Sequence, residues 1–264
     1  MRPPLPVPLP PTPAAPTSQT LCGWHAVHAA LARRPQALRR LFFAQERMSA
    51  LRPLLTDLAQ ARVAYRCVTP DELERISHSH AHQGIVAVFD APPAVQIQAP
   101  ALAQHAQTRG VWLALDGVEN PHNLGAIART AAFLGVAGLL LSQAQSGPWL
   151  STAAFRVAEG GLDQLPVWLV QDLSQALRTL VKAGAQVVAL DHRSPQSLRD
   201  LVLQDKGLRV LVAGAEEAGV SPPVLAACSH RVAIDAAQVT TRTVESLNVA
   251  AAVAIAAARM TAAV

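Results

Sequence analysis

The sequence predicts an α/β protein in which a domain with a parallel sheet follows a smaller α/β domain. Two observations lead to this prediction. Beyond residue 110, short apolar stretches alternate with helical ones, and strands separated by helices form parallel sheets that helices cover on both faces. Within residues 21–90, apolar and helical stretches alternate in the same way over a shorter span. With 264 residues, 51% of them hydrophobic, the chain can bury a core in both units.

The amino-terminal part divides into a tail and the smaller domain. Residues 1–20 are predicted to be a disordered tail, because eight of the first sixteen residues are proline, which lacks the backbone donor that helices and sheets need. Thr69, followed by proline and then by glutamate at the third helical position, is typical of a helix start. Hydrophobic spacing predicts helix 23–34, strand 38–44, helix 49–61, strand 63–68 and strand 84–89.

The rest of the chain is predicted to be a linker and the larger domain. Residues 91–108 form the linker, because its first part, 91–99, contains two prolines and has neither helical nor strand periodicity. The larger domain spans 109–264. A final helix over 246–259 is rich in alanine and valine, so it should pack closely against the sheet or against a second subunit. The predicted strands are 111–115, 138–142, 167–170, 186–190 and 209–213.

Composition argues against several classes of protein. Three cysteines lie far apart in the chain, at Cys22, Cys67 and Cys228. Their spacing fits neither a disulfide framework nor structural zinc. An alternating histidine run occurs at His78, His80 and His82, and it is more typical of a polar turn than of a metal site. The longest apolar run, 249–258, is shorter than the about 20 residues that span a bilayer, so we expect a cytoplasmic protein without membrane or metal.

Positive charge is concentrated in the smaller domain. The net charge of the chain is +4, yet residues 21–66 hold eight arginines against two acidic residues. This excess fits an anionic partner such as nucleic acid, and a solvated surface rich in arginine fits the count equally well. We predict a module that binds nucleic acid, is flexibly joined to the larger domain and contacts its partner through Arg33, Arg34, Arg39 and Arg40.

Three loops that follow predicted strands are the expected location of a ligand site, because parallel sheets bind ligands at the carboxyl ends of their strands. The first loop follows residue 115 and contains Asn123 and Arg129. Asn123 is a good helix cap, and Arg129 lies about 240° further around the helix, so the two side chains need not reach the same atom. A capped helix with an exposed arginine would look the same.

The other two loops are equally ambiguous when taken singly. In the second, Glu216 lies between Gly214 and Gly219, which suits a nucleotide-like ligand and also an ordinary glycine turn. The GxGxxG pattern of a dinucleotide-binding dehydrogenase is absent. In the third loop, we expect Ser246 to cap the last helix and Asn248 to lie in its first turn.

Together, the three loops resemble a known family. The segments NLGAIAR, LVAGAEEAG and ESLNVAAA, in this order, are similar to the three motifs of the SpoU/TrmH RNA 2′-O-ribose methyltransferases. The segments CGWHAV and HQGIVA resemble the small substrate-binding domain of that family. The resemblance covers residues 21–264. It implies a SPOUT-type catalytic domain with a carboxy-terminal trefoil knot, S-adenosyl-L-methionine (AdoMet) as cofactor, rRNA or tRNA as substrate, and a homodimer.

The resemblance also implies roles for the motif residues. Arg129 would act on the target ribose, and because the pKa of arginine exceeds 12, we favour an electrostatic or phosphate-positioning role over that of a base. No metal is required, since the sulfonium of AdoMet already activates the methyl group. The implied catalytic set is Arg129, Asn123, Glu216, Ser246 and Asn248. The residues that would line the cofactor pocket are Gly214, Gly219, Ile234 and Leu247.

One segment departs from the family pattern. Residues 235–245 contain neither proline nor glycine and are longer than the loop usual in the family, which puts the geometry of cofactor binding in doubt. The alternative function is a non-catalytic RNA-binding protein that retains the fold. That alternative predicts damaged motifs, whereas all five catalytic candidates are present.

Overall fold

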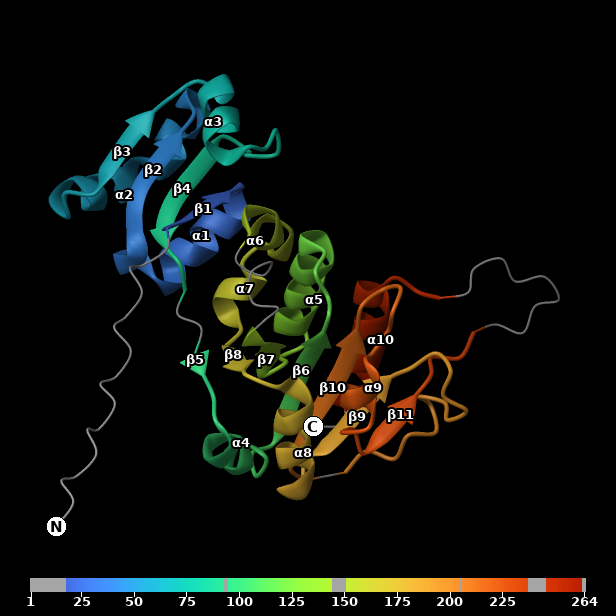
Figure 1. The fold of residues 1–264 in the computed structure, drawn as a ribbon. Coiled ribbons are helices and arrows are strands. Elements are labelled where there is room, and N and C mark those ends of the chain that lie inside the picture. The colour runs from blue at the N-terminus through green and yellow to red at the C-terminus, as the bar shows by residue number, and fades with distance from the viewer. Residues whose placement is uncertain (1–17, 93–94, 144–150, 205, 237–245, 263–264) are drawn as a thin grey trace, which may run out of the picture.

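The computed structural model describes residues 18–92, 95–143, 151–204, 206–236 and 246–262, and these form two sheets (Figure 1). The smaller sheet belongs to the amino-terminal part and the larger one to the rest of the chain. The proline-rich tail through residue 17 and residues 237–245 of the long loop lie outside the described residues, so the structure does not bear on the predictions made for them.

The smaller sheet has four strands in the order β1-β4-β2-β3. They are β1 Ser18–Cys22, β2 Leu38–Phe43, β3 Ala64–Cys67 and β4 Ile85–Asp90. The prediction of a tail through residue 20 is wrong at its end, because Ser18 already lies opposite Asp90 in an antiparallel ladder. Local composition does not reveal this pairing, since the partner strand comes much later in the chain.

Three helices accompany this sheet close to their predicted positions. They are α1 Trp24–Arg33, α2 Met48–Gln60 and α3 Pro70–Ser77. The predicted start of α3 is confirmed: the Glu72 backbone NH donates to the Thr69 hydroxyl, and the Thr69 backbone NH donates to the Glu72 carboxylate. This reciprocal capping fixes where the helix begins.

The larger sheet has seven strands, all parallel, in the order β11-β9-β10-β6-β7-β8-β5. Its five inner strands confirm the predicted ones to within one residue at each end. They are β6 Gly110–Asp116, β7 Gly138–Ser142, β8 Val167–Val170, β9 Gln186–Leu190 and β10 Leu208–Gly214. Both edge strands, β5 Val95–Gln96 and β11 His230–Val232, are missing from the prediction because they are too short to show a periodicity.

The predicted linker, 91–108, belongs in large part to the larger domain. β5 pairs in parallel with β8, and α4 Ala99–His105 contacts α8 Leu173–Lys182. Prolines at the start of this segment suggest a connector, but the pairing partner that makes β5 a strand lies far along the chain. The linker prediction is therefore wrong for the residues from Val95 onward.

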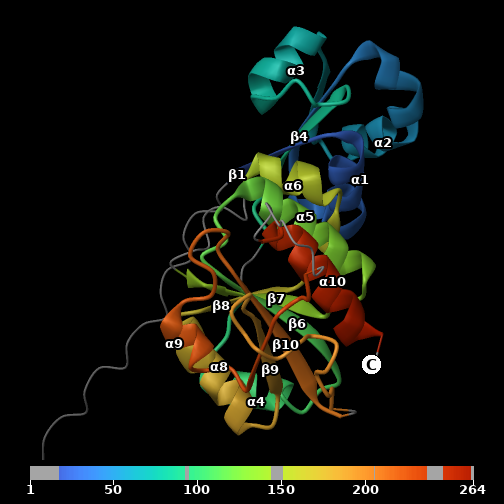
Figure 2. The same ribbon diagram turned by 90° about the vertical axis from the view of Figure 1, so that its right-hand side faces the viewer.

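Helices cover both faces of the larger sheet, as parallel sheets require (Figure 2). On one face, α5 Pro121–Phe133 and α10 Val249–Thr261 pack over a hydrophobic cluster that includes Leu113 and Leu211. On the other face, α4 and α8 pack over a second cluster that includes Trp112. Successive residues of β6 thus enter opposite cores, which explains the continuous apolar runs in the sequence.

The two domains are docked against each other. α1 contacts α6 Thr152–Ala158 and α7 Gly161–Gln164, and one hydrophobic cluster runs through the contact. The Arg34 guanidinium donates to the Asp163 carboxylate at 2.7 Å across this interface. The prediction that the two domains are flexibly joined is therefore wrong, because apolar and charged side chains of both domains are buried together.

Candidate functional site

The carboxyl ends of β6 and β10 lie side by side, with Asp116 opposite Gly214 in the ladder. The Asp116 carboxylate accepts a hydrogen bond from the Ser221 backbone NH at 2.7 Å, which ties the loop after β10 back to β6. This loop turns sharply: a Cβ on Gly214 would lie 2.1 Å from the carbonyl carbon of Gly219, whose own φ is 69°. The turn therefore requires glycine at position 214 for space and favours it at 219 for conformation.

Side chains from all three predicted loops meet at one point. The Asn248 side-chain NH₂ donates to Asn123 Oδ1 at 3.0 Å and to Glu216 Oε1 at 2.6 Å. Its Oδ1 accepts from the backbone NH groups of Ala250 and Ala251 at the start of α10, which turns the nitrogen toward the other two side chains. Segments far apart in the chain thus build one hydrogen-bonded cluster, which we call the motif cluster (Asn123, Glu216, Asn248).

Both predicted helix caps at this site are wrong. Asn248 caps α10, rather than Ser246. Asn120 caps α5 and is followed by Pro121 at the first helical position, so Asn123 lies in the first turn, where it is buried. The proline was the available sequence signal for the true cap. Because Asn120 caps the helix, the side chain of Asn123 is available to the motif cluster.

A cavity of about 1180 Å³ opens beside the motif cluster. It is larger than the about 300–1,000 Å³ typical of small-molecule sites. Among the described residues that line it, Glu216 and Ser246 come from the predicted catalytic set, whereas Arg129 lies elsewhere on α5. The four residues predicted to hold the cofactor all line the cavity: Gly214, Gly219, Ile234 and Leu247.

The cavity wall combines charged and apolar groups in a way that fits AdoMet. The apolar side chains of Leu190, Val232 and Val249 suit an adenine ring, and His192 and Arg193 suit the carboxylate of the amino-acid part. Acidic residues favour the positive sulfonium and ammonium groups. The acidic lining residues are Asp191, Glu216, Glu217 and Asp235.

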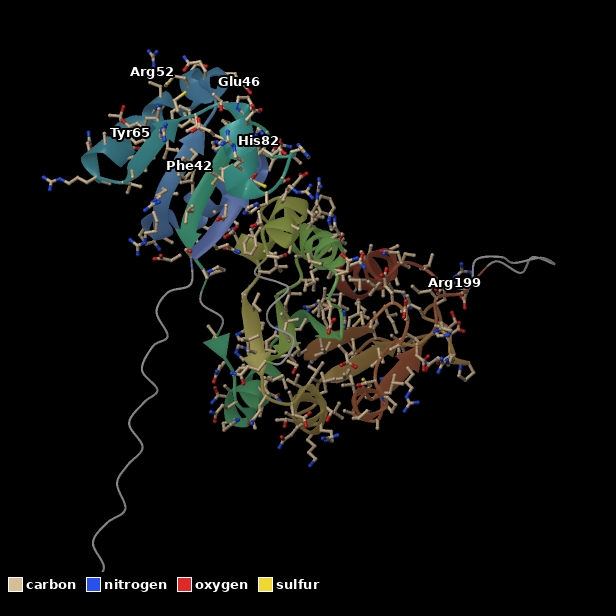
Figure 3. The ribbon with its side chains drawn as sticks, turned by 45° about the horizontal axis from the view of Figure 1, so that its top comes forward. Phe42, Glu46, Arg52, Tyr65, His82 and Arg199 are labelled. Carbon is tan, nitrogen blue, oxygen red and sulfur yellow. The ribbon has the colours of Figure 1, made fainter. Side chains whose placement is uncertain are left out.

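Arg199 lies at the outer edge of this region. Its guanidinium approaches the Asp235 carboxylate at 3.4 Å, and Asp235 also accepts a hydrogen bond from the Ser197 hydroxyl. In Figure 3, Arg199 lies at the opposite side of the molecule from Arg52 and Tyr65 of the smaller domain.

Arg129 lies on α5, is exposed and does not line the cavity. Its guanidinium forms an ion pair with the Glu159 carboxylate at 2.9 Å. Glu159 is the residue that ends α6, in a left-handed conformation with φ 45° and ψ 41°. Sequence reasoning missed Glu159, because it belongs to none of the three motifs and local spacing does not predict that α5 and α6 pack together.

The structure divides the four arginines predicted to contact RNA. Arg34 is buried, and its prediction as an RNA contact is wrong because its guanidinium is occupied by Asp163, the Asp90 carbonyl and other polar groups of the interface. Arg39 pairs with Asp90, and this hydrogen bond lowers the pKa of that carboxyl. Arg33 and Arg40 are exposed.

Two features are absent from the described residues, a membrane-spanning helix and a metal-binding cluster. No helix among them is long and apolar enough to cross a membrane. No group of three or more histidine, cysteine or acidic side chains within the described ranges is arranged to hold a metal ion. Of the histidine run, His80 pairs with Glu74 at 2.9 Å, and His82 accepts a hydrogen bond from the Gly84 backbone NH, as in a polar turn.

Two family models match the chain. Residues 110–258 match the model of the SpoU rRNA methylase family, which is more than half of the chain. Residues 20–95 match the model described as the substrate-binding domain of RNA 2′-O ribose methyltransferases. The two matches coincide with the larger and the smaller domain.

Relatives and solved structures agree with this match. The chain is 34% identical to a 23S rRNA (guanosine-2′-O-)-methyltransferase RlmB from Burkholderia, over 90% of this chain and 93% of that protein. It is 30% identical to the RlmB of Vibrio vulnificus, over 89% and 93%. An AdoMet-bound rRNA methyltransferase from Sinorhizobium meliloti shares the fold, with a TM-score of 0.71 at 24% identity, over 91% of this chain and 85% of that one. A TrmH-family structure from Porphyromonas gingivalis aligns with a TM-score of 0.70 at 26% identity, over 92% and 89%.

Proposed function

Since the chain belongs to the SpoU rRNA methylase family, we propose that it methylates the 2′-hydroxyl of a guanosine in 23S rRNA. The activity itself, AdoMet-dependent methylation of a ribose 2′-hydroxyl in RNA, follows from the family; the choice of RNA and base is the proposal. This choice is supported by the two relatives named 23S rRNA (guanosine-2′-O-)-methyltransferase RlmB, which are at least 30% identical to this chain over most of both chains. Such a substrate places the enzyme in the cytoplasm.

The cavity is the proposed AdoMet site. AdoMet supplies a methyl group that its sulfonium has already activated. The chain must therefore hold the cofactor, orient the 2′-oxygen in line with the methyl group and stabilise the negative charge that develops on that oxygen. We assign the first task to Gly214, Gly219, Ile234 and Leu247, which line the cavity.

The motif cluster and Arg129 are the proposed catalytic groups. Asn123, Glu216 and Asn248 hold the start of α5, the turn after β10 and the start of α10 in fixed relative positions, and Ser246 lies next to them at the cavity wall. Arg129 is proposed to bind a phosphate of the RNA and to orient the ribose, a role that suits the planar fork of its guanidinium.

We further propose that the active enzyme is a homodimer with sites shared between subunits and that the carboxy-terminal part is threaded as a trefoil knot. Arg129 does not line the cavity of its own chain, so it would act at the cavity of a partner. Large apolar side chains that are exposed at the end of α5, just before α10 and in the middle of α10 support such an interface. They are Phe133, 89% exposed, Leu247, 49%, and Ile255, 47%.

The RNA-binding surface of the smaller domain is proposed to centre on Arg40. In the ladder of β2 with β3, Arg40 lies opposite Ala64 and Phe42 opposite Arg66, so the two arginines share one face of the sheet. The side chain of Arg66 is 70% exposed. With Arg33 at the end of α1, these cations can neutralise phosphates, which makes binding sensitive to salt.

The direct test is methylation in vitro. The purified chain, AdoMet and unmodified transcripts of 23S rRNA or tRNA should give 2′-O-methylguanosine in 23S rRNA only. Methylation of tRNA alone would refute the proposed substrate and leave the activity intact. RNA binding without methylation of either transcript would favour the non-catalytic alternative.

The shared site has its own test. At an AdoMet concentration below the dissociation constant of Gly214→Ala, Arg129→Ala and Gly214→Ala homodimers should each have little activity, and mixing the two proteins should restore activity in part of the heterodimers. Sedimentation of a monomer at micromolar concentration would contradict the dimer.

A further inference from the structure

We infer that Glu159 is a positioning residue for the reaction: its carboxylate fixes the guanidinium of Arg129 in the orientation that receives the RNA. This inference rests on the proposed role of Arg129. It starts from the ion pair between Arg129 Nη2 and Glu159 Oε2 at 2.9 Å. Among the described residues, Glu159 is the acidic partner of Arg129, and none of the three sequence motifs contains it.

The backbone of Glu159 is unusual. Its φ of 45° and ψ of 41° lie in the left-handed region, where helix ends normally have glycine or asparagine. A residue that carries a Cβ is disfavoured there, because the Cβ approaches the backbone. Strained residues that persist at a site are often held for function. Glu159, the residue with this strained backbone, is also the residue whose side chain reaches Arg129.

The segment that carries Glu159 is held from both sides. A Cβ on Gly160 would lie 2.4 Å from the Cβ of Ala29 in α1, so the smaller domain presses directly on this residue. A Cβ on Gly161 would lie 2.9 Å from the Cα of Arg129 and 2.7 Å from the Ala128 carbonyl oxygen. The two glycines allow α1 and α5 to approach the segment closely, so the backbone that carries Glu159 has a fixed position relative to both.

The pair also remains accessible to RNA. The side chain of Arg129 is 58% exposed and that of Glu159 is 38% exposed. An exposed pair contributes little to stability, because water screens both charges. The carboxylate forms an ion pair with Nη2 at one end of the guanidinium, so the other NH groups of the fork can bind a phosphate oxygen in a defined direction.

This arrangement links the two domains functionally. The smaller domain binds RNA and contacts Gly160, whereas Glu159 is bonded to the arginine that orients the ribose. The contact of α1 with Gly160 therefore sets the position of Arg129 relative to RNA held by the smaller domain. A positioning role of this kind predicts that loss of the carboxylate slows the reaction without weakening the binding of either AdoMet or RNA.

The test uses Glu159→Gly in the full chain, because glycine suits the left-handed backbone and removes the carboxylate. We expect a melting temperature at or above that of the unmodified protein, a dissociation constant for AdoMet within twofold, and RNA affinity unchanged or higher, since a negative charge is lost. Single-turnover methyl transfer to a 23S rRNA transcript should fall at least tenfold. Glu159→Gln, which keeps a hydrogen-bond acceptor, should lose less.

His78→Gly is the matched control. His78 ends α3 with φ 52° and ψ 36°, so it has the same left-handed position at a helix end, but it is not near Arg129. This variant should gain stability and keep its rate. A Glu159→Gly protein with an unchanged or faster rate, or one whose slower rate follows weaker RNA or AdoMet binding, would overturn the inference. If Arg129→Ala itself retains activity, the proposed role of Arg129 fails first, and the inference fails with it.

Discussion

Two arginine–carboxylate pairs connect distant segments of this chain, in opposite surroundings. The side chains of Arg34 and Asp163 are 11% and 1% exposed, and they join the smaller domain to α7. Those of Arg129 and Glu159 are 58% and 38% exposed, and they join α5 to α6 next to the same interface. The residue types and the contact are alike, whereas the access of water differs.

This difference predicts different roles. Arg34 lies 4.9 Å from the centre of the Phe89 ring and also donates to Gln19. Burial raises the pKa of Asp163, and its second oxygen has no hydrogen-bond partner among the described residues. Removing one member of such a pair leaves a buried charge, which is strongly destabilising. The exposed pair adds little stability and leaves its arginine available to a substrate.

The largest expected effect is on catalysis. Arg129→Ala should lower the single-turnover rate by about 10²–10³-fold, as expected when a group that stabilises developing charge is lost. Its free energy of unfolding should change by no more than about 0.5 kcal/mol. Arg129→Lys should rescue poorly, because an ammonium lacks the planar fork.

Calorimetric titration with AdoMet separates this prediction from a role in cofactor binding. The affinity of Arg129→Ala should equal that of the unmodified chain. A tenfold loss of AdoMet affinity, about 1.4 kcal/mol, would show that Arg129 belongs to the cofactor site. The proposed difference in role between the two pairs would then not hold.

The buried pair should show the reverse behaviour. Arg34→Met should lower the free energy of unfolding by about 3–5 kcal/mol, because the Asp163 charge is left without its partner. Since burial already raises the pKa of Asp163, the deficit should grow as the pH rises through that raised pKa and shrink toward acid, where the carboxyl is protonated. Urea denaturation at several pH values measures both effects.

A second variant controls for packing. Arg34→Met combined with Asp163→Leu should recover most of the lost stability, because no charge remains buried. Equal destabilisation of the single and double variants would show that the arginine stem, rather than the charge pair, accounts for the effect.

A smaller effect should appear in cofactor binding. Gly214→Ala places a methyl group 2.1 Å from the Gly219 carbonyl carbon, so the turn that lines the cavity must open. We expect the dissociation constant of AdoMet to rise at least tenfold. The rate at saturating AdoMet should change less than it does in Arg129→Ala. A slower rate without weaker AdoMet binding would show that this turn acts in methyl transfer rather than in cofactor binding.

The smallest effect should distinguish a paired from an unpaired surface arginine. Arg40→Ala should reduce the slope of log affinity for RNA against log salt by about one, because one phosphate contact is lost. Arg39→Ala should reduce it less, since Arg39 is already bonded to Asp90. Equal slopes for both variants would show that pairing does not decide which arginines contact RNA.

The sequence predicted local features well and long-range ones only through the family resemblance. Strand 138–142 and the capping of α3 are local, because apolar runs and a Thr-Pro-Asp-Glu segment determine them within a few residues. β5 is not local: two residues become a strand only because β8 lies beside them. The misplaced caps at Asn123 and Ser246 have a different, local cause, because several polar residues compete for one position.

The sequence by itself therefore determined the five inner strands of the larger sheet and the residue types that converge in the motif cluster. The tertiary structure alone decided which charges are buried. Arg34 and Arg40 are equivalent in a count of charges, yet one is enclosed between two domains and the other faces solvent. Only the packing of α5 on α6 brings Glu159 to Arg129, because an ion pair depends on distance in space and not on separation along the chain.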